Sequence, residues 1–183
     1  MTQESNSPED LSREALDAYL LGAYENAVHG FKAAKHEFLN RGDDINAAEA
    51  ANNLSVVLLK MDLGYEALEA VKGTPEIFQH AGNQQMEAMA LGNLASALEA
   101  TGEVKQAEEC YLQALGCLEE TDDQETRSYI LQALSRLQLR GGKPFDALTS
   151  MQGALDSQPR LTLRDRILRK LFKIPARLLG RGS

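Results

Sequence analysis

The chain has no tryptophan, only two cysteines and few aromatic residues. Cys110 and Cys117 are seven residues apart on one expected helix, which places them about 10 Å from each other, too far for a disulfide bond. We interpret them as small buried side chains or free thiols in a reducing compartment, because a redox role would need a partner that the chain does not supply.

Long apolar runs are also missing. No stretch of 18 apolar residues could form a membrane-spanning helix. Residues 1–10 are polar and acidic, without the apolar core of a signal peptide. We therefore expect a cytoplasmic protein, in which any association with a membrane is peripheral.

Motifs for catalysis and metal binding are absent as well. There is no glycine-rich phosphate loop and no nucleophile elbow. His29 and His36 are two helical turns apart, too far to share one metal ion, and His80 lies in another part of the chain. Acidic residues gather in turns such as 42–44 and 121–123, where they suit helix N-caps and a solvated surface. We predict a protein that is not an enzyme and that has no cofactor and no metal site.

What the sequence has is a repeat of 40 residues. Alanine recurs at this interval, each time followed four residues later by a large side chain and seven residues later by a small one. The alanines are Ala27, Ala67, Ala107 and Ala147, the large residues Phe31, Val71, Tyr111 and Met151, and the small residues Ala34, Thr74, Ala114 and Ala154. Upstream, Leu54, Leu94 and Leu134 are each followed by a small residue. Because such a unit must stack on similar neighbours to bury its apolar face, the period predicts an array of helix hairpins.

Three departures from this repeat are informative. Asp62 stands where the other units have a turn glycine. The run Gly-Thr-Pro at 73–75 falls inside the expected second helix of the second unit, so this helix should kink or restart there. In the fourth unit Gln138 replaces a packing leucine, which leaves Leu137 as the nearest apolar residue.

In this register the chain resembles the tetratricopeptide repeat family, in its form with units of about 40 residues. Segments 22–34, 53–67 and 102–114 carry the resemblance best. It implies an all-α fold, a right-handed solenoid of four helix-turn-helix units, and the function of a scaffold or adaptor that binds protein segments and helps to assemble complexes. The expected units are residues 9–42, 43–82, 83–122 and 123–157, after a disordered N-terminus over residues 1–8.

The resemblance also implies a concave groove lined by the first helix of each unit. Asn53 and Asn93 share one register there, and in long-repeat relatives an asparagine at this position holds the backbone of an extended peptide. Its amide offers both a donor and an acceptor to a peptide group. The alternative to a peptide-binding role is that the two asparagines cap a helix locally or form a contact between adjacent helices. The predicted groove residues are Arg13, Asn52, Asn53, Lys60, Asn93, Ser96, Gln132 and Arg136, a mixture that suits a polar, peptide-like ligand.

The tail differs from the rest of the chain in charge. Residues 159–183 have eight basic residues and one acid, a balance of +7, while the whole chain carries −8, which leaves −15 for residues 1–158. On a helical wheel its apolar residues occupy one half and most basic residues the other, so we predict a basic amphipathic helix over residues 158–183, bent near Pro175. The residues expected to contact a membrane or a partner are Arg164, Arg166, Ile167, Arg169, Lys170, Leu171, Phe172, Lys173, Arg177 and Leu178.

Three interpretations of this tail stay open. It covers the exposed end of the solenoid, it lies in the interface of an anionic membrane, or it docks on an acidic surface, which includes the chain's own groove. Nucleic acid is not an expected partner, because the acidic body repels phosphate. Self-association through uncovered ends is a further expectation. Two functions follow: a peptide-binding adaptor that the tail can bring to a membrane surface, or a regulatory sensor whose tail fills the groove until a partner displaces it.

Overall fold

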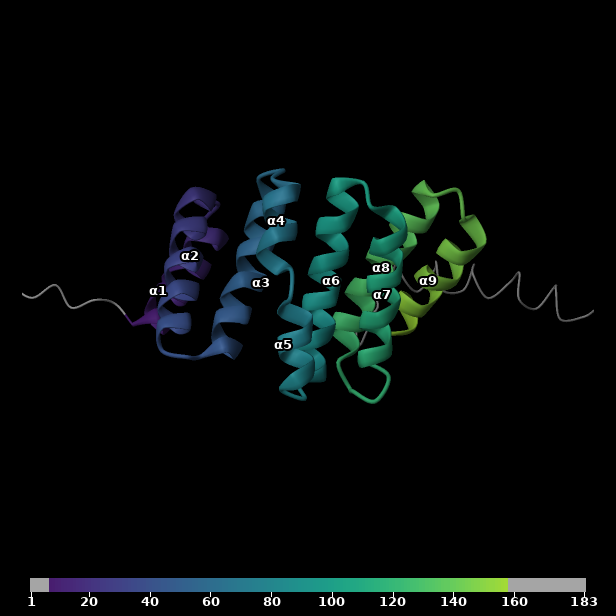
Figure 1. The fold of residues 1–183 in the computed structure, drawn as a ribbon. Coiled ribbons are helices and arrows are strands. Elements are labelled where there is room, and N and C mark those ends of the chain that lie inside the picture. The colour runs from purple at the N-terminus through teal and green to yellow at the C-terminus, as the bar shows by residue number, and fades with distance from the viewer. Residues whose placement is uncertain (1–6, 158–183) are drawn as a thin grey trace, which may run out of the picture.

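The structure, a computed structural model, describes residues 7–157, and these residues form nine helices. The helices are α1 (Pro8–Leu20), α2 (Tyr24–Asn40), α3 (Asp44–Lys60), α4 (Gly64–Val71), α5 (Thr74–His80), α6 (Gln84–Thr101), α7 (Val104–Cys117), α8 (Gln124–Arg140) and α9 (Pro144–Asp156). Figure 1 shows the helices stacked in chain order, from α1 at one end of the array to α9 at the other. The predicted all-α solenoid is therefore confirmed, while the predicted tail helix lies outside the described residues.

Each unit is a pair of antiparallel helices joined by a short turn, and in the second unit the second helix is divided into α4 and α5. The first helices are α1, α3, α6 and α8, and each packs on the helix or helices that follow it. From the second unit on, the first helix also packs against the second helix of the preceding unit. The apolar side chains of neighbouring units consequently share core clusters, as expected for stacked repeats.

The second helix of the second unit is interrupted where the sequence predicts. Helix α4 ends at Val71, Gly73 takes a φ of 83°, and α5 starts again with Pro75 in its first turn. The Thr74 hydroxyl donates to the Val71 carbonyl at 2.8 Å and so satisfies one of the acceptors that the helix end leaves open. The predicted restart is confirmed.

Asp62 keeps the turn conformation that glycine has in the other units. Its φ is 59°, against 76° for Gly22, 88° for Gly102 and 72° for Gly142. Aspartate is one of the few residues with a side chain that tolerates this left-handed conformation. The substitution therefore leaves the path of the chain between α3 and α4 unchanged.

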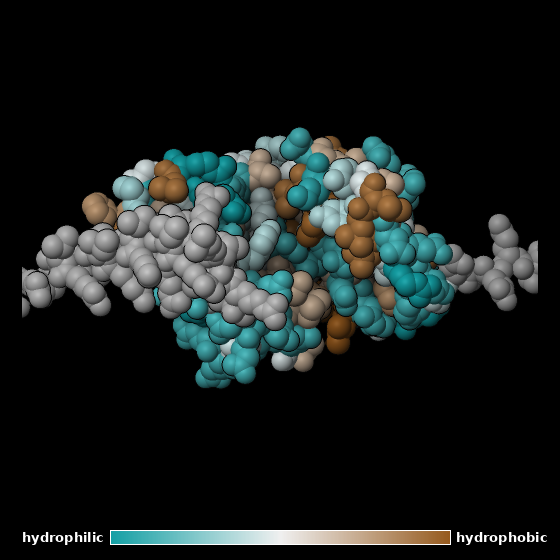
Figure 2. All heavy atoms as spheres, turned by 180° about the vertical axis from the view of Figure 1, so that it is seen from behind, coloured by the Kyte–Doolittle hydropathy of each residue, from teal (hydrophilic) through white to brown (hydrophobic). Residues whose placement is uncertain are grey.

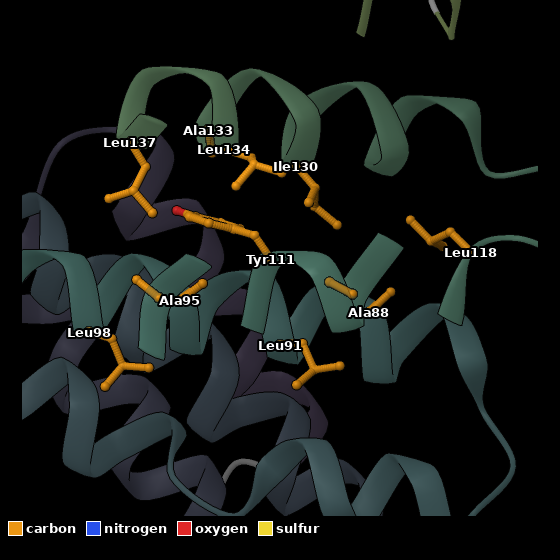
Figure 3. Close-up of a cluster of buried hydrophobic side chains, with 12 residues drawn as sticks. Ala88, Leu91, Ala95, Leu98, Tyr111, Leu118, Ile130, Ala133, Leu134 and Leu137 are labelled. Atoms are coloured by element: carbon orange, nitrogen blue, oxygen red, sulfur yellow. The ribbon is translucent and has the colours of Figure 1, made fainter. Parts of the chain in front are cut away.

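The repeated residues form the contacts between helices. All four repeat alanines are buried. In the third unit the ring of Tyr111 lies below α8, beside Leu134 and Leu137, as Figure 3 shows. At the other end of the array, Gly30 in α2 approaches Ala15 in α1 so closely that a β-carbon on Gly30 would lie 2.7 Å from that of Ala15. Small residues thus set the spacing of the helices, and large ones fill what remains.

Gln138, the departure in the fourth unit, is buried within a polar network. Only 7% of it is exposed, and the Ser150 hydroxyl donates to its side-chain oxygen at 2.8 Å. Its amide donates to the carboxylate of Glu108 at 3.4 Å, and Lys143 donates to the same carboxylate at 2.6 Å. The hydrogen bond from Lys143 holds the pKa of Glu108 below its ordinary value. A polar residue is tolerated at this packing position because two neighbouring helices supply its partners.

Candidate functional site

The predicted groove residues all lie on the first helices of the units. Helix α1 carries Arg13, and α3 carries Asn52, Asn53 and Lys60. Helix α6 carries Asn93 and Ser96, and α8 carries Gln132 and Arg136. Figure 2 shows the face opposite to that of Figure 1, where the described surface is mostly hydrophilic and its apolar patches are separate. A surface of this kind suits a ligand with both polar groups and a few apolar side chains.

Two of the predicted asparagines bind each other. The Asn93 amide on α6 donates to the side-chain oxygen of Asn52 on α3 at 2.9 Å. Asn52 is 2% exposed, so this bond joins two units from within. Asn53, which shares the register of Asn93, is half-buried and makes no side-chain hydrogen bond within residues 7–157. The contact between adjacent helices is therefore present. It joins Asn93 to Asn52, although the 40-residue register aligns Asn93 with Asn53.

Several other predicted groove residues are engaged within the fold. The Ser96 hydroxyl donates to the Gly92 carbonyl at 2.9 Å and lies 3.0 Å from the Tyr111 hydroxyl. The Gln132 amide donates to Ser128 at 3.2 Å.

The three predicted cationic residues differ in whether the fold already supplies a partner for their charge. Arg13 donates to Asp10 on its own helix. Lys60 and Arg136 are exposed and form no ion pair with any other described residue. Of the predicted side chains, these two and Asn53 are the ones that the described structure leaves available to a ligand.

A hollow of about 370 Å³ opens between α6 and α8. Its lining is Met89, Gly92, Asn93, Glu125, Thr126, Tyr129 and Ile130. Tyr129 is 56% exposed and Met89 is 42% exposed, so two large side chains of neighbouring first helices face solvent at this hollow. Asn93 is the only predicted groove residue among them, so the hollow adjoins the Asn52–Asn93 bond.

The hollow owes its shape to small and capping residues. Gly92 has no side chain to fill the space in front of Ile130. The Asp123 carboxylate accepts from the Thr126 backbone N–H at 3.0 Å, which fixes the start of α8 and places Glu125 at the rim. The site combines apolar walls, one amide and an acidic rim, an arrangement that can hold an apolar side chain with a basic neighbour.

Sequence analysis missed Met89 and Tyr129, although a signal was present. The two residues are 40 positions apart, so they are equivalent in the repeat, and the equivalent residue of α3 is Glu49. In this register the second unit has a charged residue, whereas the third and fourth have large apolar ones. Exposed apolar residues at one register position of two neighbouring first helices form a candidate binding surface.

A second cleft, of about 630 Å³, lies between α2 and α4. Leu54, Leu58 and Leu63 are among its apolar walls, and Tyr65 and Glu66 are on its lining as well. Its sides are the second helices α2 and α4, Leu54 and Leu58 of α3 contribute to its apolar wall, and it contains none of the predicted groove residues. It provides the matched control for experiments on the hollow between α6 and α8.

The cysteines show no sign of activation. Burial raises the pKa of Cys117 to about 11, with a further contribution from Glu87, and burial also raises that of Cys110. A raised pKa disfavours the thiolate, which is the nucleophilic form. Within residues 7–157 no group of three or more His, Cys, Asp or Glu side chains could hold a metal ion. In the same residues, no helix has the length and apolarity needed to cross a membrane.

Comparison with known proteins supports the fold. Neither a protein-family model nor a curated protein sequence matches the chain. Among solved structures, BtubC (BKLC) from P. vanneervenii matches 87% of this chain and 71% of its own, with 18% identity and a TM-score of 0.72.

Two structures of MamA match as well. The protein from Desulfovibrio magneticus RS-1 (residues 41 to the end) matches 86% of this chain and 80% of its own, with 21% identity and a TM-score of 0.62. The MamA RS-1 ArsTM double mutant matches 84% and 76%, with 20% identity and a TM-score of 0.61. At these identities the likeness shows a shared fold, and the chain has the solenoid fold that its tetratricopeptide resemblance implies.

Proposed function

We propose that the chain is a non-catalytic scaffold that binds a segment of a partner protein along its first helices and so helps to assemble a complex. The observation that carries the proposal is the hollow between α6 and α8, with Asn93 on its lining and two exposed large side chains beside it. It is the part of the predicted groove where apolar and polar contacts lie together.

The contacts available there suit an extended peptide. Because the Asn93 amide nitrogen donates to Asn52, its side-chain oxygen would accept from a peptide N–H in a fixed orientation. An apolar side chain of the same peptide would enter between Met89 and Tyr129. Removing such a side chain from water contributes about 1.5–3 kcal/mol, which is enough to make this position an anchor. Lys60 and Arg136 would then contact acidic or carbonyl groups further along the peptide.

The basic tail is the second element of the proposal. Its amphipathic pattern would bring the scaffold to an anionic membrane surface, or it would regulate access to the groove. The acidic rim of the hollow favours the second role, because it attracts a basic segment.

A peptide display experiment tests the binding function. The full chain is used to select binders from a random peptide library, and the selected peptides are measured against Tyr129→Ala, Asn93→Ala and Tyr65→Ala. We expect the first two substitutions to weaken binding at least tenfold, and Tyr65→Ala, an exposed aromatic residue in the other cleft, to leave it unchanged. Circular dichroism checks that each variant keeps its helix content. The selection is repeated with Phe172→Asp, which weakens any occupation of the groove by the tail. A library that yields no binders for either chain, or binders lost only with Tyr65→Ala, would contradict the proposal.

A further inference from the structure

We infer that the hollow between α6 and α8 recognises an apolar residue flanked by basic residues, and that its occupant in the free protein is this chain's own segment 163–179. The inference rests on the proposed function in that it uses the same hollow, and it specifies the chemistry that the hollow selects.

The end of the hollow near the start of α8 is negatively charged. Residues 119–125, the loop before α8 and the start of that helix, contain five acids and no base. Glu125 lies on the lining itself, directly beside the apolar walls of Met89, Tyr129 and Ile130. At the other end Arg136 lies two turns beyond Tyr129 on α8. An occupant should therefore be apolar at its centre and basic toward the start of α8.

The segment 163–179 has this composition. The run 168–173 reads Leu-Arg-Lys-Leu-Phe-Lys, so Leu168 and Phe172 are four residues apart and share one face of a helix, with three basic residues between and beside them. The acidic body of the chain, −15 over residues 1–158, favours association with this segment, which has six basic residues and one acid, a balance of +5.

The segment can reach the hollow of its own chain. Helix α9 packs directly on α8, and α8 borders the hollow. Helices in contact are about 8–10 Å apart, so the hollow is about 20 Å from the axis of α9. Phe172 follows Ser157 by 15 residues, which span about 50 Å when extended and about 22 Å as a helix. Either form bridges the distance.

Continuation of the solenoid is the competing arrangement, and the repeat register argues against it. From the second unit on, two positions of each first helix belong to core clusters shared with the preceding unit. They are Ala50 and Val57 in α3, Ala90 and Ala97 in α6, and Ile130 and Leu137 in α8. One period later the same positions hold Lys170 and Arg177. A fifth unit stacked in register would bury two cations in an apolar junction, at high cost.

The absence of tryptophan allows a direct test in the full chain. Phe172→Trp places a single indole on the face that should enter the hollow, and Leu168→Trp does the same one turn earlier. We expect blue-shifted emission and protection from acrylamide quenching in both variants. Added Tyr129→Ala or Glu125→Lys should remove the shift, while Tyr65→Ala and Glu66→Lys, the matched changes in the cleft between α2 and α4, should leave it.

Four outcomes would overturn the inference. They are emission typical of solvent, a shift that Tyr129→Ala and Glu125→Lys leave intact, a shift that disappears on dilution because it arises between two copies, and a shift that needs vesicles of anionic lipid. The measurement needs no partner, so its failure leaves the peptide-binding proposal standing. Conversely, a library without binders would not affect the emission of the tail.

Discussion

The close approach of α1 and α2 makes Gly30→Ala the sharpest test of the packing argument. A β-carbon at Gly30 would lie 2.7 Å from the β-carbon and 3.3 Å from the α-carbon of Ala15, and 3.4 Å from the carbonyl oxygen of Leu11. These neighbours are backbone atoms or the atom attached to the backbone, so no side-chain rotation can relieve the clash. The two helices would have to separate.

The size of the effect follows from two opposing contributions. Overpacking of a tight contact costs about 1–3 kcal/mol. Replacing glycine by alanine inside a helix stabilises it by about 0.5–1 kcal/mol. We expect a net loss of about 1–2 kcal/mol in the free energy of unfolding, which lowers Tm by about 2–8 °C in a chain of this length.

The same substitution at Gly92 is the matched control, because only the space around the new methyl group differs. Gly92 is also inside a helix, but its β-carbon would lie 3.5 Å from Ile130, an ordinary contact. Here the helix contribution is not offset, and Tm should rise by about 1–4 °C. Thermal unfolding followed by circular dichroism compares the two variants with the parent chain. If Gly30→Ala were as stable as Gly92→Ala, small residues would not set the helix spacing.

Three further predictions concern single side chains. Because the pKa of Glu108 is lowered in the folded state, its carboxylate contributes to stability above the unfolded pKa of about 4.5, and this contribution is lost as the pH falls through the folded pKa. The substitution Glu108→Gln should therefore reduce the difference in urea resistance between pH 7 and pH 3. Cys117, with a pKa raised to about 11, should react with iodoacetamide at pH 8 far more slowly than a free thiol, and a rate equal to that of cysteine would contradict its burial. At Asp62, whose φ is positive, Asp62→Val should lower Tm and Asp62→Gly should not, and the reverse order would show that the turn has rearranged.

The repeat made most of the fold predictable, because one periodic pattern determines several elements at once. The positions of Ala27 and its three counterparts predict where second helices pack, and all four are buried. The restart at 73–75 could be predicted from proline chemistry alone, since the ring removes a donor and clashes with the preceding turn. Such features are local or periodic, and they do not depend on the detailed path of neighbouring helices.

The site was less predictable because hydrogen bonds depend on geometry finer than a register. Asn93 reaches Asn52 rather than Asn53, a difference of one residue that turns the side chain about 100° around the helix. Gln138 looked like a defect in a packing position, yet Ser150 and Glu108 on other helices satisfy it. Neither the Asn93–Asn52 bond nor the hydrogen bonds of Gln138 recur every 40 residues, so the repeat in the sequence does not predict them.

The α1 end of the array also differs from its interior in a way that bears on self-association. At the register of Ala50 and Val57, helix α1 carries Asp10 and Asp17. A second copy that stacked its last unit on α1 with the interior geometry would bury two carboxylates, and unpaired buried charges cost several kcal/mol each. End-to-end stacking through this face is therefore unfavourable unless the incoming surface is basic. The units stack because their junctions are apolar, and charge at the same register in α1 disfavours the stacking of a second copy on this face.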